Sequence, residues 1–339
     1  MRAIDGAEGE GGGQILRTAL AVSLITGEAF ELTNIRARRK RGGLLAQHLA
    51  AVRAATAVGE AEVHGDTLES MHLIFRPKRI TPGHHQFSVG TAGSAMLVLQ
   101  TVLPPLLLAD QPSKVRVEGG THNPASPAYD FFERTFLPQL ARMGADVRAK
   151  LIRPGFYPRG GGIVEAEIKP TGRWKPFTLL ERGDLLYRRA VARVAGLSPS
   201  IAQREIKTFL NLAGWAPSET LTEVLDDRFG PGNVFLAELV FREVTEIASG
   251  FGERRVPAEA VAESVATAVK SYLALSAPVG EHLADQLLLP LAIGAGGTFH
   301  TVPLTSHTAT QIDTLRRFLN ADVATTARED GSVDVVVRR

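Results

Sequence analysis

The sequence predicts an α/β protein of the α+β kind, with three repeats of a two-helix plus mixed-sheet unit and a smaller inserted α/β domain. Two observations predict this fold. Apolar residues recur three or four positions apart in some segments and alternate in others, which is typical of amphipathic helices and half-buried strands. The order helix, strand, helix, strand also returns three times along the chain, which indicates an internal repeat.

The first repeat covers residues 11–64. Helical spacing is present over 14–26 and 44–58, and strand alternation over 29–35 and 61–64. The second and third repeats follow the same order. Their expected helices and strands are, along the chain, 95–108, 114–118, 129–143 and 145–150, then 283–293, 297–303, 310–319 and 322–326. We therefore expect helices packed together on mixed sheets.

One long stretch breaks this rhythm between the second and third repeats. We expect it to form a smaller inserted α/β domain over 184–277 and the repeats to form a large domain, residues 1–183 and 278–339, that carries the active site. The elements expected in the insert are strands 187–195 and 233–241 and helices 201–212 and 258–275.

The composition is that of an ordinary globular protein, with 44% hydrophobic and 22% charged residues in a chain of 339. The absence of cysteine excludes disulfides, thiolate catalysis and cysteine-ligated zinc or iron–sulfur sites. The first residues lack a charged region followed by an apolar stretch, so we expect no secretory signal and a cytoplasmic location. The longest apolar run, 95–109, is too short to span a bilayer, so no membrane partner is expected.

The most informative segment is the glycine-rich turn near the N-terminus. Asp5, Glu8 and Glu10 lie among several glycines, and Arg17 follows in the first turns of an expected helix. Glycines and a helix N-terminus favour a phosphate, and the carboxylates could hold a divalent metal beside it. The turn matches neither the Walker A pattern nor the dinucleotide fingerprint. Its spacing alone leaves open a solvated glycine-rich hairpin.

A strongly basic loop follows the first expected strand. Five of the six residues 36–41 are arginine or lysine, although the net charge of the whole chain is only +2. Such a run is typical of a solvated loop, and it also suits contact with a phosphate backbone. Both interpretations stay open on the loop alone.

Short strings in a fixed order connect nearly the whole chain to one known family. They are Asp5 to Arg17, Gly90 to Ser94, Leu99 to Pro104, Gly119 to Thr121, Gly155 to Pro158 with Gly160 to Gly162, Gly230 to Asn233, Leu283 to Gln286 and the segment around His307. In these strings the chain resembles the RNA 3'-terminal phosphate cyclase family. Members have three repeats and a smaller inserted domain, which agrees with the division above.

The resemblance implies ATP-dependent conversion of an RNA 3'-terminal phosphate to a 2',3'-cyclic phosphate, with release of pyrophosphate and AMP. A histidine first attacks the α-phosphorus of ATP and forms a covalent histidine–AMP. AMP then passes to the RNA 3'-phosphate, and the adjacent 2'-hydroxyl closes the ring. The resemblance thus implies a ligase-type nucleotidyl-transfer enzyme of RNA processing and repair, with ATP, Mg²⁺ or Mn²⁺, and a 3'-phosphate RNA as partners.

His307 aligns with the family's nucleophile. We expect it just before the helix 310–319, whose N-terminus favours a neutral imidazole and a bound phosphate. The resemblance assigns the supporting roles as follows: Glu10 to the metal; Arg17 and Arg36, with Arg39 in reserve, to the RNA terminal phosphate or pyrophosphate; and Gln100, His282, Leu283, Ala284, Asp285 and Gln286 to the nucleotide.

Within that set, Asp285 is the carboxylate that we expect to orient His307 or the metal. Other histidines are expected in structural roles. His48 lies on an apolar helix and is expected in the core, whereas His84 and His85 are expected in a solvated turn.

Two alternatives remain. A cyclase-like protein without the nucleophile would act in ribosomal RNA processing as a binding or scaffold protein, and the presence of His307, Glu10, Arg17 and Asp285 favours catalysis instead. An enolpyruvyl transferase shares the repeat architecture, but it needs no ATP or adenylated histidine. The sequence leaves open the physiological RNA, the preferred metal, adenylation of 5'-phosphate ends, the role of the insert, and whether the chain is a monomer or a homodimer.

Overall fold

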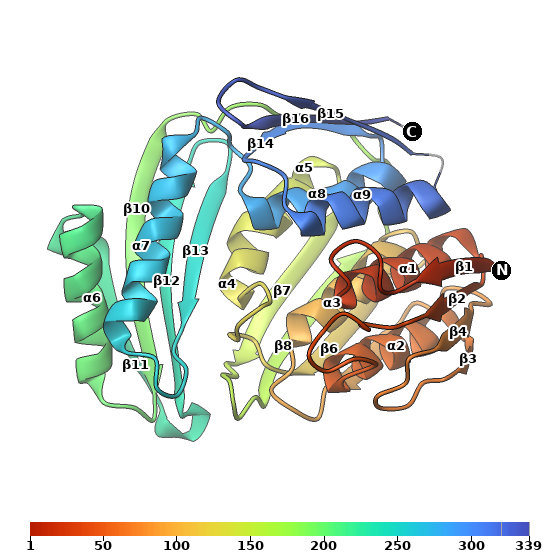
Figure 1. Cartoon of the computed structure of the whole chain (residues 1–339), viewed down its shortest axis with the longest axis horizontal. Helices are drawn as coiled ribbons and strands as arrows, with labels where there is room; N and C mark the ends of the chain where they lie inside the picture. Colours follow the sequence, from red (N-terminus) through yellow and green to blue (C-terminus); the bar gives the residue numbers. More distant parts are fainter. Residues whose placement is uncertain (320, 339) are drawn as a thin grey trace.

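The computed structural model describes residues 1–319 and 321–338 and contains four sheets of four strands each. Residues 320 and 339, both inside the range predicted for the large domain, lie outside the described residues. Figure 1 shows helices at the centre of the molecule, with three sheets around them and the sheet of β10–β13 to one side.

Each repeat has the order strand, helix, strand, helix, strand, strand, although the second helical segment of the second repeat is divided. The first two strands of each unit are parallel, and the second and third strands both pair antiparallel with the fourth. The predicted α+β fold of three repeats is confirmed, with an additional strand at each end of the expected unit.

The first unit consists of β1 (Arg2–Asp5), α1 (Gly13–Thr26), β2 (Phe30–Thr33), α2 (Ala46–Gly59), β3 (Glu62–His64) and β4 (Leu73–Arg76). The second consists of β5 (His84–Ser88), α3 (Ala95–Leu107), β6 (Ser113–Gly119), α4 (Tyr129–Phe131), α5 (Leu137–Arg142), β7 (Asp146–Arg153) and β8 (Gly162–Lys169). The third consists of β9 (Phe177–Leu179), α8 (Glu281–Ile293), β14 (Gly297–Thr301), α9 (Ser306–Phe318), β15 (Asp322–Ala327) and β16 (Val333–Arg338).

A separate sheet interrupts the third unit between its first strand and its first helix. Its elements are β10 (Leu185–Ala195), α6 (Pro199–Ala213), β11 (Thr220–Leu225), β12 (Gly232–Phe241), β13 (Thr245–Phe251) and α7 (Ala258–Ala274). The strand order is β11-β10-β12-β13, and α6 and α7 pack together on this sheet.

The core lies where helices of the three units meet. α1 packs against α2, α3 and α9, and α8 packs against α9 (Figure 1). α3 is buried along almost its whole length, which explains why its sequence is apolar on every face. Because these helices come from different repeats, their ends bring distant parts of the chain to one place.

The structure differs from the sequence-based expectation mainly in short strands. The turn expected at His84 and His85 is instead β5, which pairs parallel with β6. Its side chains alternate between exposed and half-buried positions, so no apolar alternation marks it in the sequence. The segment expected as one helix over 129–143 is divided by a π-helical turn, Phe132–Phe136.

Candidate active site

A cavity of about 1280 Å³ lies where α1, α3, α8 and α9 meet β13 and α7 of the insert. This volume is larger than the ~300–1,000 Å³ of a typical small-molecule pocket. Many of the predicted site residues line it, namely Glu10, Arg17, Arg36, Arg39, Gln100, His282, Asp285, Gln286 and His307.

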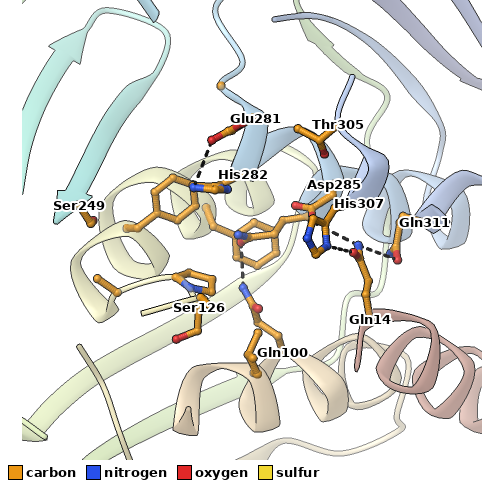
Figure 2. Close-up of a pocket in the computed structure, with 18 of the residues that line it drawn as sticks. Gln14, Gln100, Ser126, Ser249, Glu281, His282, Asp285, Thr305, His307 and Gln311 are labelled. Carbon is orange, nitrogen blue, oxygen red and sulfur yellow. Dashed lines mark hydrogen bonds and ion pairs between the residues drawn. The ribbon is translucent and has the colours of Figure 1, made fainter. Parts of the chain in front are cut away.

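His307 lies in the first turn of α9, which begins at Ser306 and therefore earlier than the expected 310–319. The reason is a cap: Oγ1 of Thr305 accepts a hydrogen bond from the Thr308 N–H at 3.2 Å. Nδ1 of His307 is 2.7 Å from Oε1 of Gln14 (Figure 2). The other ring nitrogen, Nε2, has no hydrogen-bond partner among the residues that the structure describes.

Among the described residues, Asp285 is linked to His307 by hydrogen bonds through Gln14. Its Oδ2 is 3.2 Å from Nε2 of Gln14, and no hydrogen bond joins Asp285 to His307 within the described part of the chain. Desolvation raises the pKa of the Asp285 carboxyl to about 7, while the charge of Arg17 and the Gln14 hydrogen bond oppose the rise. The hydrogen bonds therefore connect Asp285 to His307 through Gln14, and the expected role of Asp285 in orienting His307 or the metal stays a prediction.

Glu10 presents a buried carboxylate to the cavity, with its side chain only 3% exposed. Oε2 pairs with Arg39, whereas Oε1 is buried without any hydrogen-bond partner among the described residues. A divalent cation would satisfy such an oxygen, because Mg²⁺ is usually held by one or two carboxylates together with substrate phosphates. Glu10 therefore fits a metal that is shared with a phosphorylated substrate.

Glycine allows the loop around Glu10 to lie against α9. Gly9 has φ of +55°, and a Cβ at this position would overlap Oγ1 of Thr310. The same Oγ1 accepts a hydrogen bond from the Glu10 N–H at 2.9 Å. The close approach thus fixes the carboxylate of Glu10 relative to the helix that carries His307.

The guanidinium of Arg17 lies in the cavity and makes no hydrogen bond to the protein within 1–319 and 321–338. Desolvation lowers its pKa to about 10, opposed by the charges of Glu10 and Asp285, so it stays protonated at neutral pH. Its planar donors are free to bind a phosphate in bidentate fashion.

Arg36 contributes in a different way from Arg17. It has φ of +55°, and its Nη1 donates to the carbonyls of Arg41 and Gly43 at 2.8 and 3.0 Å. These bonds fold the basic loop back on itself and hold Arg36 and Arg39 at the cavity wall. The desolvated guanidinium of Arg36 has a lowered pKa because of burial and the nearby charge of Arg39.

The cavity extends from His307 toward a mainly apolar part that suits a nucleobase. Nε2 of Gln100 donates to Oε1 of Gln286 at 2.8 Å, and His282 meets the ring of Phe131 edge-on at 6.3 Å between centroids. Figure 2 labels Gln100 and His282 at this part of the cavity. Leu97 and Pro127 add apolar surface to this region. Amide groups between apolar walls are typical of small-molecule sites.

The structure does not bring Leu283 and Ala284 into the cavity. Both are buried in the core, with 0% and 1% exposure, because they lie on the inner face of α8 while His282, Asp285 and Gln286 face the cavity. Helical spacing separates the two sets, because His282, Asp285 and Gln286 are three and four positions apart and share one face of α8, whereas Leu283 and Ala284 turn to the other side.

Sequence reasoning missed several residues that line the cavity, among them Gln14, His48, Phe131, Ser249 and Gln311. His48, expected in the core, is indeed only 3% exposed, but it also borders the cavity. Burial and the charges of Arg17 and Arg36 lower its pKa to about 3, so it is neutral. The apolar pattern of its helix concealed this second role.

Two features are absent from the residues that the structure describes. No group of three or more histidine, aspartate or glutamate side chains there could hold a metal by itself. None of the helices is long and apolar enough to cross a membrane, as far as the structure describes the chain.

Fold and cavity together define a protein of three α/β repeats with a histidine-bearing, arginine-lined cavity suited to an anionic substrate. The chain belongs to the RNA 3'-terminal phosphate cyclase family, which matches residues 8–325.

Similar proteins cover almost the whole chain. The RNA 3'-terminal phosphate cyclase of Koribacter versatilis is 51% identical over 319 residues, 94% of this chain and 90% of that protein. The protein of the same name from Salmonella enteritidis is 46% identical, with 97% and 96% covered. That of Ectopseudomonas mendocina is 44% identical, with 99% and 98% covered. These likenesses favour the cyclase over the enolpyruvyl transferase alternative.

Proposed function

We propose that this protein is an enzyme that converts the 3'-terminal phosphate of RNA to a 2',3'-cyclic phosphate with ATP. Its membership of the cyclase family supports the reaction and both substrates. The structural observation that carries the proposal is that Nε2 of His307 and the guanidinium of Arg17, neither with a hydrogen-bond partner among the described residues, share one cavity.

The first step is attack of Nε2 of His307 on the α-phosphorus of ATP. The N–P bond forms as the bond to the bridging oxygen breaks, and pyrophosphate leaves with that oxygen. An oxygen of the RNA 3'-phosphate then displaces the histidine and takes up AMP. Finally the neighbouring 2'-hydroxyl attacks the activated phosphorus, loses its proton to the surroundings and releases AMP. Covalent catalysis divides one difficult reaction into three easier ones.

The cationic and acidic groups of the cavity stabilise this chemistry. Arg17 and Arg36 bind the terminal phosphate or the departing pyrophosphate, and Arg39 stands beside them at the Glu10 carboxylate. Oε1 of Glu10 would hold Mg²⁺ or Mn²⁺, which supplies positive charge at the triphosphate when bound. Preorganised charge of this kind is often the largest contribution to such catalysis.

The apolar end of the cavity receives the adenosine. Gln100, His282 and Gln286 bind it, with Phe131 forming part of the wall. Asp285 holds Gln14 and adds negative charge close to Arg17. The insert completes the cavity through β13 and α7. The division into a large domain of residues 1–183 and 278–339 and a smaller domain of residues 184–277 stays a prediction. The cytoplasmic location also stays a prediction.

The test is incubation of the purified protein with ATP labelled at the α-phosphate and a divalent metal, without RNA. We expect acid-labile, base-stable label on the protein, as a phosphoramidate requires, and its transfer to an RNA with a 3'-phosphate. His307→Ala should lose all label while its unfolding midpoint in urea stays close to that of the parent.

Each result has one meaning. Label that persists in a folded His307→Ala protein would exclude His307 as the nucleophile. Absence of label from the parent protein across metals and pH values would favour the second candidate, a non-catalytic relative that binds RNA during its processing.

A further inference from the structure

A chain of hydrogen bonds lies behind His307, on the side of the ring away from Nε2. Oε1 of Gln14 contacts Nδ1 of His307 at 2.7 Å, and Nε2 of Gln14 contacts both Oδ2 of Asp285 at 3.2 Å and Oε1 of Gln311 at 3.3 Å. Oγ1 of Thr18 donates to the same Gln311 oxygen at 2.5 Å. Figure 2 shows Gln14 between His307, Asp285 and Gln311.

The neighbours of Gln14 determine which end of its amide faces the histidine. The amide oxygen of Gln311 accepts a hydrogen bond, as does the Asp285 carboxylate at a pH above its pKa of about 7, so the NH₂ group of Gln14 faces them. Its carbonyl oxygen is then the end that remains for His307. A reversed amide would place one oxygen against two other acceptors, which is unfavourable in a site where Gln14 and Gln311 are both buried.

We infer that Gln14 is a positioning residue that selects one tautomer of the catalytic histidine. A carbonyl oxygen can only accept, so Nδ1 of His307 carries the proton and Nε2 carries the lone pair. The consequence for catalysis rests on the function proposed above. The tautomer itself is a property of the free protein and does not depend on any substrate.

The selection matters because a neutral imidazole has a single nitrogen able to attack phosphorus. When Nε2 attacks, its lone pair forms the N–P bond and the ring becomes positively charged, with the proton retained on Nδ1. The hydrogen bond from Nδ1 to the Gln14 carbonyl strengthens as that charge develops, so it stabilises the transition state more than the ground state. No proton has to leave the ring.

A direct test is nuclear magnetic resonance of the full chain labelled with ¹⁵N in histidine. His307→Asn identifies the signals of His307 by their loss. At a pH where the ring is neutral, we expect Nδ1 at the shift of a protonated nitrogen and Nε2 at that of an unprotonated one. In Gln14→Leu the two shifts should move toward an average of both tautomers.

A kinetic test uses three variants and the rate of AMP attachment from labelled ATP. Gln14→Leu should be slowed about 10- to 100-fold, the range found when the hydrogen-bond partner of a metal-ligating histidine is removed. Gln14→Glu keeps an acceptor at Nδ1, so it should retain more activity than Gln14→Leu. Its carboxylate also stabilises the imidazolium, which should shift the acidic limb of the rate profile upward by about one pH unit.

Gln139→Leu is the matched control. Gln139, on α5, is also buried, and its amide donates to the Glu243 carbonyl at 3.0 Å outside the cavity. It should attach AMP at the rate of the parent protein.

Two results would overturn the inference: a parent His307 that carries its proton on Nε2, or a Gln14→Glu protein as slow as Gln14→Leu with an unshifted pH profile. The spectra need neither ATP nor RNA. A parent protein with the expected tautomer but without AMP attachment would therefore contradict the proposed function and leave the positioning role of Gln14 intact.

Discussion

At the scale of single residues, the cavity holds polar groups that the protein itself leaves unpaired. Oε1 of Glu10 is buried without a hydrogen bond, and the donors of Arg17 face the cavity without one, among the residues that the structure describes. Leaving a buried polar group unpaired typically costs about 1–3 kcal/mol. A phosphate with its cation would satisfy both groups, so the fold keeps them ready at the expense of its own stability.

Replacing Glu10 by glutamine tests whether the unpaired carboxylate oxygen of Glu10 holds a metal ion. Glu10→Gln keeps the shape of the side chain but removes the charge, so AMP attachment should fall about 10- to 100-fold and need more divalent metal for half-maximal rate. Glu8→Gln is the control, because Glu8 is exposed in the same loop and pairs with Arg317. The rate is measured against metal concentration, and chelation should stop both proteins. Equal metal dependence of the two variants would exclude Glu10 as a ligand.

The residues that could be predicted are those that belong to local strings. Glu10 and Arg17 stand in the glycine-rich turn, and His307 stands in a string matched to the family. Gln14 and Gln311 could not be predicted in their roles, because their hydrogen bonds cross 271 to 297 positions of sequence. A lone glutamine on an apolar helix carries no local signal of a partner that distant.

At the scale of elements, the glycine-rich loop and α9 form one contact that the chemistry depends on. The loop reaches the helix through Gly9, and the hydrogen bond from Glu10 to Thr310 holds it there. α9 also begins at the Thr305 cap, which places His307 on the helix rather than before it. A helix cap and a glycine contact therefore help to set the position of the Glu10 carboxylate relative to His307.

Adding one methyl group at Gly9 should disturb this contact. Gly9→Ala combines a left-handed φ with overlap at Thr310, so we expect a loss of about 2–3 kcal/mol in unfolding free energy and slower AMP attachment. Gly27→Ala is the control: φ is +72°, but apart from its chain neighbours no atom of the described residues lies within 4 Å of the added Cβ. It should lose only about 1 kcal/mol, with normal activity. Urea unfolding measures the loss in unfolding free energy of both variants. Equal losses would show that the left-handed φ alone, and not the overlap with Thr310, causes the destabilisation.

Helices were more predictable than strands because an amphipathic repeat of ten or more residues leaves a clear pattern. α1 and α3 lie within one residue of their expected bounds. β9 has three residues, and its partner β14 lies beyond the whole insert, so neither length nor neighbourhood marks it in the sequence. β5 and β11 are short, with many exposed side chains, and likewise lack an apolar alternation.

At the scale of the whole molecule, buried charged groups join the insert to the repeats. Arg193 of β10 donates to Asp130 of the second unit at 3.2 Å, and Asp130 lies 2.8 Å from the ring of His122. On the other side, the buried carboxyl of Glu246 of β13 lies against Gly280 at the start of α8. Such groups give the interface a stability that depends on pH.

Glu246 should make the protein less stable as the pH rises. Burial raises its pKa to about 8, so between pH 5 and 8 the folded state keeps a proton that the unfolded chain has lost. Unfolding free energy should therefore fall across this window, by at most ~1.4 kcal/mol per pH unit for this group, and level off above it. Glu205, with its pKa raised to about 7 by burial, acts in the same direction.

Substitution separates the contribution of Glu246 to the pH dependence of stability from the contributions of other titrating groups. Glu246→Gln should reduce the difference in unfolding free energy between pH 5 and pH 8, as measured by urea titration at both values. Glu253→Gln, in the exposed loop after β13, should leave that difference unchanged. A Glu246→Gln protein with the full pH dependence of the parent would show that this carboxyl is ionised in the folded state.

The separation of Gln14 from His307 by 293 positions also affects how the protein is made. A ribosome releases the glycine-rich loop and two complete repeats well before it reaches α9. β9 cannot pair with β14 until the insert between them has been translated. Nascent chains and products of interrupted translation therefore lack His307, the nucleophile that we propose. Under the proposed mechanism, attachment of AMP therefore begins only in chains whose synthesis has passed the start of α9.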